Sequence, residues 1–227
     1  LYGWFPDIEG TLNLEVPGGG GDTASVSASD LIDSLEGVFM AAYEGRKGDW
    51  SVKLDLLYLD LENSSNQSIT VTPPGAGFQA SSKQGMTGTQ VGVYGGYTVA
   101  RTEDYVFDVL AGLRYFEIDA DAQLQFTGTL PPQGPSLNLS QSVDLWDAVV
   151  GVKGSYDLDQ NWYIPYHFDV GAGDSDLTWQ AVAGVGYRFE WGNVLAAYHH
   201  LVYDQGGSGL IQDIEFSGSA VGVSFEF

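Results

Sequence analysis

The sequence predicts an all-β fold, a transmembrane antiparallel up-and-down β-barrel of about 10 strands. One observation is the C-terminal alternation, in which Val221, Val223, Phe225 and Phe227 are separated by small or polar residues. Successive side chains on a strand point to opposite faces, so one face here is apolar and aromatic and the other is small or polar. The same two-residue period recurs along the chain. The joints between the periodic segments alternate in kind. Four are short turns, and three of the other five are long loops.

Composition supports one domain over residues 1–227. Hydrophobic residues make up 44% of the chain, but no run of 18 apolar residues occurs, which excludes a transmembrane helix; a membrane strand needs only about 9 to 11 residues. The net charge of −22, from 30 acidic and 8 basic residues, argues against nucleic acid as a partner. Cysteine is absent. The first residues have no basic and apolar leader pattern, so we expect a mature or trimmed chain.

Alternating segments define the strands in order. Pro165 stands within the seventh segment, and because proline has no N–H to donate, we expect a bulge or a missing hydrogen bond there. The even number of segments is typical of single-chain bacterial barrels. The segments are 2–16, 35–46, 49–61, 87–101, 104–118, 143–156, 161–172, 177–190, 193–204 and 214–227.

The joints predict short periplasmic turns and longer extracellular loops, with both termini on the periplasmic side. The loops 62–86 and 119–142 each contain a Pro-Pro pair between alternating segments, so we expect hairpins that extend the barrel wall beyond the membrane. The exposed edges of such hairpins can pair with another chain; an inert rigid shield is the alternative interpretation. The four short turns are Gly48-Asp49, Glu103-Asp104, Asp159-Gln160 and Gly192-Asn193.

Aromatic residues gather near the expected strand ends, as in the interfacial girdles of membrane barrels. One predicted girdle, beside the short turns, contains Trp50, Tyr105, Trp162, Trp191 and Phe227; the opposite one contains Tyr58, Tyr115, Trp146 and Trp179.

Alternation places the mid-strand charges inside the barrel. We expect a buried ionic network, because unpaired charges in a narrow interior are costly. In it Lys53, Arg114, Lys153 and Arg188 pair with Asp55, Asp108, Asp147 and Glu44, and the same lining also includes His167, Asp169 and His199.

Neither catalysis nor a resident cofactor is expected. His167 and Asp169 share one strand face, and His199 lies two strands away, about 10 Å at the usual strand spacing, deep in a lumen that a large substrate cannot reach. Acidic pairs on the outer loops could bind Ca²⁺ or Mg²⁺, which prefer oxygen ligands. The candidate ligands are Asp119, Asp121, Asp174 and Asp176. Solvated acidic loops are the alternative interpretation.

The segment 27–61, the opening Gly3-Trp4-Phe5-Pro6-Asp7-Ile8-Glu9-Gly10 and the terminal Phe227 resemble small proteobacterial outer-membrane proteins of the porin-like, OmpA/OmpW-like β-barrel group. This resemblance implies a fold and a bacterial outer-membrane location, with membrane lipid and lipopolysaccharide as surroundings. It supplies no catalytic residue. The pair His199-His200 after Tyr198 departs from the expected pattern, where an arginine and an aromatic residue would stand.

Two functions remain open from the sequence. The first is a narrow polar pore that passes small solutes or cations, because acidic residues outnumber basic ones. The second is an occluded structural or adhesive barrel, whose extracellular hairpins and acidic rim bind a neighbouring surface component or another copy of the chain. A ten-stranded barrel is near the size whose interior side chains can fill. Whether a continuous water path crosses the lumen distinguishes the two.

Overall fold

The computed structural model describes residues 2–15, 23–27, 35–71, 76–128, 136–205 and 211–225, and these are all in strands or short connections. No helix in these residues is long and apolar enough to cross a membrane. The strands are β1 (Tyr2–Glu15), β2 (Thr23–Ser27), β3 (Leu35–Lys47), β4 (Trp50–Val71), β5 (Ala76–Arg101), β6 (Tyr105–Gly128), β7 (Ser136–Asp157), β8 (Trp162–Gly173), β9 (Leu177–Phe189), β10 (Gly192–Asp204) and β11 (Ile211–Ser224).

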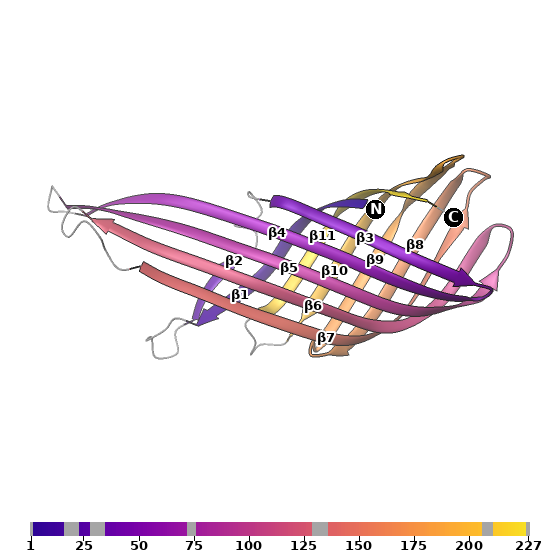
Figure 1. The fold of residues 1–227 in the computed structure, drawn as a ribbon, viewed down its shortest axis with the longest axis horizontal. Helices are drawn as coiled ribbons and strands as arrows, with labels where there is room; N and C mark the ends of the chain where they lie inside the picture. Colours follow the sequence, from indigo (N-terminus) through magenta and orange to yellow (C-terminus); the bar gives the residue numbers. More distant parts are fainter. Residues whose placement is uncertain are drawn as a thin grey trace.

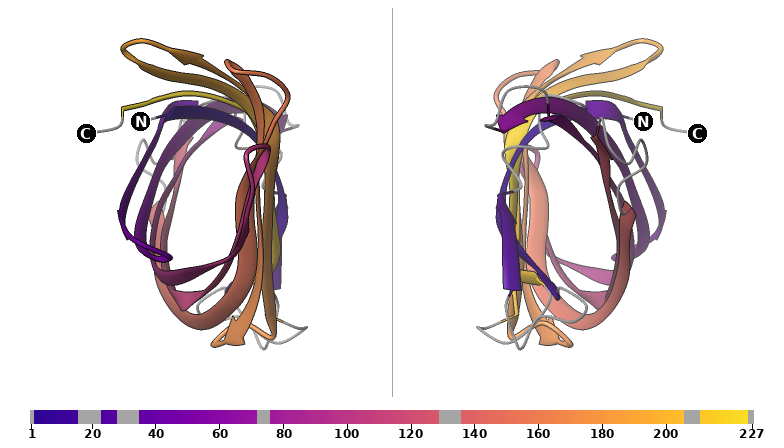
Figure 2. Two further views of the ribbon diagram at one scale, coloured as in Figure 1. Left: turned by 90° about the vertical axis from the view of Figure 1, so that its right-hand side faces the viewer. Right: turned by 90° about the vertical axis from the view of Figure 1, so that its left-hand side faces the viewer.

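Ten of these strands form a nearly closed antiparallel barrel, which confirms the predicted fold class. Neighbours along the chain are neighbours in the sheet from β3 to β11, and β11 pairs with β1 to complete the ring. The seam lies between β1 and β3, where Tyr2 opposite Met40 is the single register pair in the described residues. Among the residues that the structure describes, the short β2 pairs only with the outer part of β1. Seen end-on, the ring is an oval with two long facing walls (Figure 2).

The two rims differ as the sequence predicts. One rim, the short-turn end, carries the tight connections between β3 and β4, β5 and β6, β7 and β8, and β9 and β10. Gly48 in the first of these turns has a φ of 63°, a conformation that glycine adopts without steric cost. In the third turn, the backbone N–H groups of Trp162 and Asn161 donate to the Asp159 carboxylate at 2.7 and 2.8 Å, and they hold its pKa below the usual value.

The strands β4 to β7 run far past the opposite rim (Figure 1). There they form a four-stranded sheet that we call the outer ribbon, beginning at the register line that joins Glu62, Gly85, Asp121 and Ser140. The segments predicted as extracellular hairpins therefore continue the wall of the barrel in the described residues. Both Pro-Pro tips lie outside those residues.

Alternation along each strand separates the two faces of the barrel wall. On β4, Val52, Leu54 and Leu56 are exposed, whereas Leu57 and Leu59 are buried inside the ring. Apolar side chains are exposed in the same way on β3 and on β5 to β11, which gives this part of the wall an apolar outer surface. Pro165 on β8 keeps its place in the register with β7, but it has no partner in the β8–β9 ladder. The predicted loss of hydrogen bonding is therefore present, without a bulge.

Candidate functional site

The lumen is the candidate site, and near the short-turn end it is lined by ion pairs. Lys153 on β7 bridges two acids, contacting Glu44 on β3 and lying 3.9 Å from Asp108 on β6. Asp108 is buried and also accepts hydrogen bonds from Arg46 at 2.5 Å and from Thr98 at 2.7 Å. Each acid therefore has a cationic partner, and water still reaches this level, because about a third of the Glu44 side chain is exposed (33%).

Halfway along the lumen lies a second, largely buried polar cluster centred on Asp169 of β8. Arg114 on β6 reaches past β7 to pair with Asp169, and both side chains are 0% exposed. His167 Nε2 lies 2.6 Å from Asp169 Oδ2, and the Gln180 amide donates to the same oxygen at 2.6 Å. Arg114 also donates to Thr178 on β9 at 3.0 Å. Three donors thus surround one carboxylate, which is what a buried charge requires.

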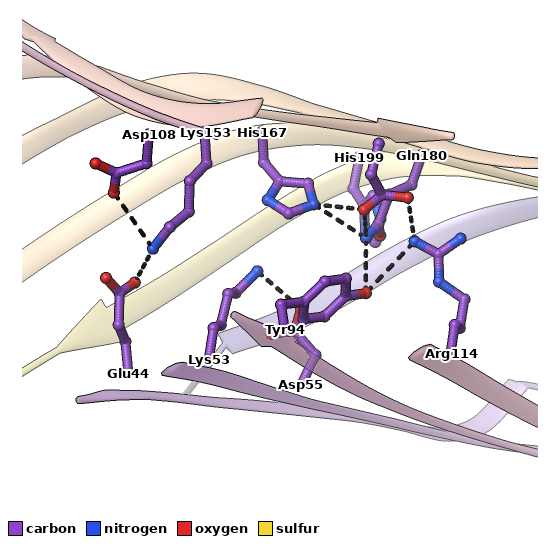
Figure 3. A network of polar contacts seen from close by, with 11 residues as sticks. Glu44, Lys53, Asp55, Tyr94, Asp108, Arg114, Lys153, His167, Gln180 and His199 are labelled. Atoms are coloured by element: carbon purple, nitrogen blue, oxygen red, sulfur yellow. Dashed lines mark hydrogen bonds and ion pairs between the residues drawn. The ribbon is translucent and has the colours of Figure 1, made fainter. Parts of the chain in front are cut away.

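This second cluster joins the two long walls of the oval. Figure 3 shows Lys153, His167, Gln180 and His199 projecting from one wall towards Lys53 and Tyr94 on the other. The Tyr94 hydroxyl on β5 lies 3.4 Å from both Gln180 on β9 and Arg114. His199 on β10 lies 3.1 Å from Gln180, and its ring stacks on Trp4 of β1 with centroids 4.4 Å apart. The interactions therefore cross the lumen.

Beyond this cluster, towards the outer ribbon, the lumen is filled by apolar side chains. The ring of Tyr203 on β10 stacks on Phe116 of β6 with centroids 4.4 Å apart, and its hydroxyl donates to Gln90 on β5 at 2.7 Å. Since β5 and β10 lie five strands apart in a ring of ten, these contacts join opposite sides of the barrel. The buried layer consists of Trp4, Met40, Leu57, Leu59, Met86, Phe116, Ile118, Leu145, Leu201, Tyr203, Ile214, Phe216 and Ala220.

The side chains of this layer are packed tightly against one another. Water lining a channel would contact the side chains around it, yet Tyr203, Phe216 and Leu201 are 0% exposed. Such close packing is typical of protein interiors, in which voids larger than a water molecule are few. At this level the described side chains therefore contact one another and not water.

The ion pairs differ in part from those predicted. Lys53 pairs with Asp55 at 2.7 Å, as expected. Arg114 does not pair with Asp147, although the two residues are direct partners in the β6–β7 register. The backbone N–H and hydroxyl of Ser175 both donate to Asp147 at 2.9 Å and satisfy it, which leaves Arg114 to bind Asp169.

Arg188 was predicted to belong to the lumen network, but it does not join the other ion pairs there. It pairs with Asp157 at 2.7 Å, close to the short-turn end, where both side chains remain about one-third exposed (33% and 30%). Its guanidinium also lies 4.5 Å from the centre of the Tyr163 ring. Asp157 stands at the end of β7 and is nearer to Arg188 than the acids deeper in the lumen.

Sequence reasoning missed Tyr94 and the apolar layer as parts of the site. The signal for the layer is present on β4, where Leu56-Leu57-Tyr58-Leu59 is apolar at consecutive positions. A strand that is apolar on both faces is buried on both faces or faces lipid on one of them. The predicted polar lumen is therefore correct only for the half near the short-turn end.

The predicted girdle residues lie on the outer surface or near it. At the short-turn end, Trp50, Tyr105, Trp162 and Trp191 are exposed; towards the other rim Tyr58 and Trp146 are exposed, while Tyr115 and Trp179 are intermediate. Phe227 lies outside the described residues. Trp50 packs against Tyr97 and Tyr115 against Trp146, with ring centroids 4.9 and 4.7 Å apart. Aromatic pairs thus mark both rims, and their role in lipid stays a prediction.

The acidic residues proposed as metal ligands are all exposed. Asp119 and Asp121 lie on β6, and Asp174 and Asp176 lie in the β8–β9 turn. The Asp174 carboxylate accepts the backbone N–H of Trp146 at 2.9 Å. Among the residues that the structure describes, no three acidic or histidine side chains come together as a metal site. Binding of Ca²⁺ or Mg²⁺ at these pairs stays a prediction.

No protein-family model and no curated protein matches the sequence. A solved structure described as the structure of the RagAB peptide transporter aligns with 85% of this chain and 26% of that one, at a TM-score of 0.39 and 10% identity. The chain thus spans about a quarter of the length of that protein. The predicted OmpA/OmpW-like group and proteobacterial origin stay predictions.

Proposed function

We propose that this chain is a bacterial outer-membrane β-barrel with an occluded lumen, and that it acts at the cell surface through its outer ribbon. The observation that carries the proposal is the contact of Tyr203 with Phe116 and Gln90 across the ring. Side chains from opposite walls touch at this level, so the interior stabilises the barrel and leaves no path for a solute.

The outer surface supports a membrane location. Its exposed side chains between the two rims are largely aliphatic, for example Val93, Leu113 and Val150, which are 47%, 55% and 59% exposed. A continuous apolar band bounded by aromatic residues is how membrane barrels meet lipid. A soluble protein with such a surface would expose a much larger apolar patch than is usual for monomers.

The closed lumen also supports the hypothesis that the chain is not an enzyme. His167 and Asp169 form a hydrogen-bonded pair, but Arg114, Gln180 and Tyr94 occupy the space beside them. A general base must reach the proton it removes, and here other protein groups fill the reachable positions. The pair is better explained as part of the structural network.

A narrow pore is the competing proposal, and the hydrated ion pairs near the short-turn end favour it. Planar-bilayer recording distinguishes the two. We expect no stepwise currents from the wild-type chain even at high protein load. As a positive comparison, Phe116→Ala combined with Tyr203→Ala removes the two stacked rings and should introduce currents. Cation-selective steps from the wild type would overturn the occluded barrel.

A further inference from the structure

The outer ribbon has a long unpaired edge on β4. The β3–β4 register ends at Leu35 opposite Leu61, whereas the β4–β5 register continues to Val71. Within the described part of the chain, Glu62–Val71 therefore has a strand on one side only. At about 3.3 Å per residue, this edge is about 33 Å long. It carries backbone N–H and C=O groups that point away from β5 and can pair with a further strand.

Proteins usually protect such an edge with lysine, proline or a bulge, and none of these occurs here. The β4–β5 register is unbroken over this length. The sequence of residues 63–71, NSSNQSITV, has no charged residue and no proline. The facing strand β5 is uncharged from 76 to 82, as are β6 from 122 to 128 and β7 from 136 to 143. In a chain with a net charge of −22, two copies can approach through these uncharged stretches with little charge repulsion.

The direction of β4 determines how a second copy fits. The strand runs away from its own barrel, so two identical β4 edges lie antiparallel only when the barrels point towards each other. In one membrane the two edges would be parallel, and β3, which flanks β4 up to Leu61, would obstruct the neighbouring barrel. A copy in an opposing membrane meets no such obstacle. Its outer ribbon approaches from the side of its own membrane, and its barrel lies beyond the tip of the first copy's ribbon.

We propose that the outer ribbon binds a second copy of this chain in an opposing membrane, through antiparallel pairing of the Glu62–Val71 edges. This inference rests on the proposed surface function and specifies its partner. The β4 edge is preferred to the edge of β7, because the unpaired part of β7 begins directly beside Trp146, a predicted girdle residue whose backbone is bonded to Asp174. The edge on β4 begins four residues beyond the girdle residue Tyr58.

The test uses the full chain reconstituted in phosphatidylcholine vesicles, with a chelator to prevent bridging by divalent cations and about 0.15 M salt to screen repulsion. Wild-type vesicles should cluster, as measured by light scattering. Asn66→Lys with Gln67→Lys places like charges at the centre of the paired edges and should abolish clustering. Asn66→Asp with Gln67→Glu should do the same. Mixing the two variant populations should restore it.

The matched control lies one strand away. Ser81 and Ala80 on β5 are the register partners of Asn66 and Gln67, so Ala80→Lys with Ser81→Lys adds the same charge at the same height, off the edge. This variant should cluster like the wild type. Dispersed wild-type vesicles, or clustering of the Asn66→Lys, Gln67→Lys population by itself, would overturn the pairing.

Ion flux measured in the same vesicles separates this inference from the proposed function. Vesicles that stay dispersed and show no ion flux would overturn the pairing, and the proposal of an occluded barrel would stand. Leaky vesicles would overturn the occluded barrel whether or not they cluster.

Discussion

The buried pair of Arg114 and Asp169 gives the most quantitative test of the closed lumen. Both side chains are 0% exposed, and they join β6 to β8 across the intervening strand. Replacing Asp169 with alanine removes the only acidic group bonded to Arg114 in the described part of the chain, and it also removes an acceptor of Gln180. The guanidinium then remains buried without a counter-charge.

The expected loss follows from the burial. Removing one partner of a buried ion pair typically costs about 3 to 5 kcal/mol, because an uncompensated charge is left in the interior. In a water-filled pore the same change would cost about 1 kcal/mol or less, as for exposed pairs. Replacing both partners by apolar residues, Arg114→Met with Asp169→Leu, should cost clearly less than the sum of the single changes, since no charge is stranded.

The assay is reversible urea unfolding in phospholipid vesicles, followed by tryptophan fluorescence. The matched control is Asp157→Ala, which breaks the Arg188 pair where both side chains are about one-third exposed, and it should cost about 1 kcal/mol or less. Equal, small losses for Asp169→Ala and Asp157→Ala would refute the reasoning, because they would mean that water reaches Arg114 as easily as Arg188.

Three further predictions concern other parts of the barrel. Tyr203→Phe leaves the Gln90 oxygen, its acceptor at 2.7 Å, without that donor, and should lower the unfolding free energy by about 1 to 3 kcal/mol; a change near zero in urea titration would contradict the closed layer. Gly48→Ala should cost about 1 to 2 kcal/mol, since φ is 63°, and Gly48→Asn less; equal melting temperatures would contradict this. The lowered pKa of Asp159 means that its carboxylate stabilises the turn above the ordinary value of about 3.9, and that this contribution is lost as pH falls through the lowered pKa. Asp159→Asn should remove that pH dependence in NMR titration of the turn amides, and an unchanged titration would contradict the assignment.

The strands could be predicted from the sequence because the alternation of apolar and polar residues and turn chemistry are local signals. Trp50 and Trp162 each begin a strand directly after a short turn, and the structure starts β4 and β8 at these residues. The sequence analysis separates the barrel strand 49–61 from the hairpin expected in 62–86, whereas the structure joins them in the single strand β4. Residues 62–68 are polar and lack the apolar alternation of the barrel strands, yet β4 continues through them because β5 pairs with it to Val71.

The pairing inside the lumen could not be read from the sequence. Arg114 stands opposite Asp147 in the register, so a local prediction joins them. Two features determine the actual partner of Arg114. The curvature of the barrel wall brings β8 within reach of the long Arg114 side chain, and the two donors of Ser175 satisfy Asp147. Both depend on the closed ring and not on neighbouring residues in the chain.

Thiol accessibility tests the central claim most directly, since the chain has no cysteine of its own. Leu57→Cys places a thiol in the buried layer, where Leu57 is 1% exposed, and Glu44→Cys places one among the hydrated ion pairs. With a small charged thiol reagent added to both sides of the membrane, we predict modification of the Glu44→Cys variant and none of Leu57→Cys while the barrel is folded. Rapid modification of Leu57→Cys, at a rate similar to that of Glu44→Cys, would contradict a closed lumen.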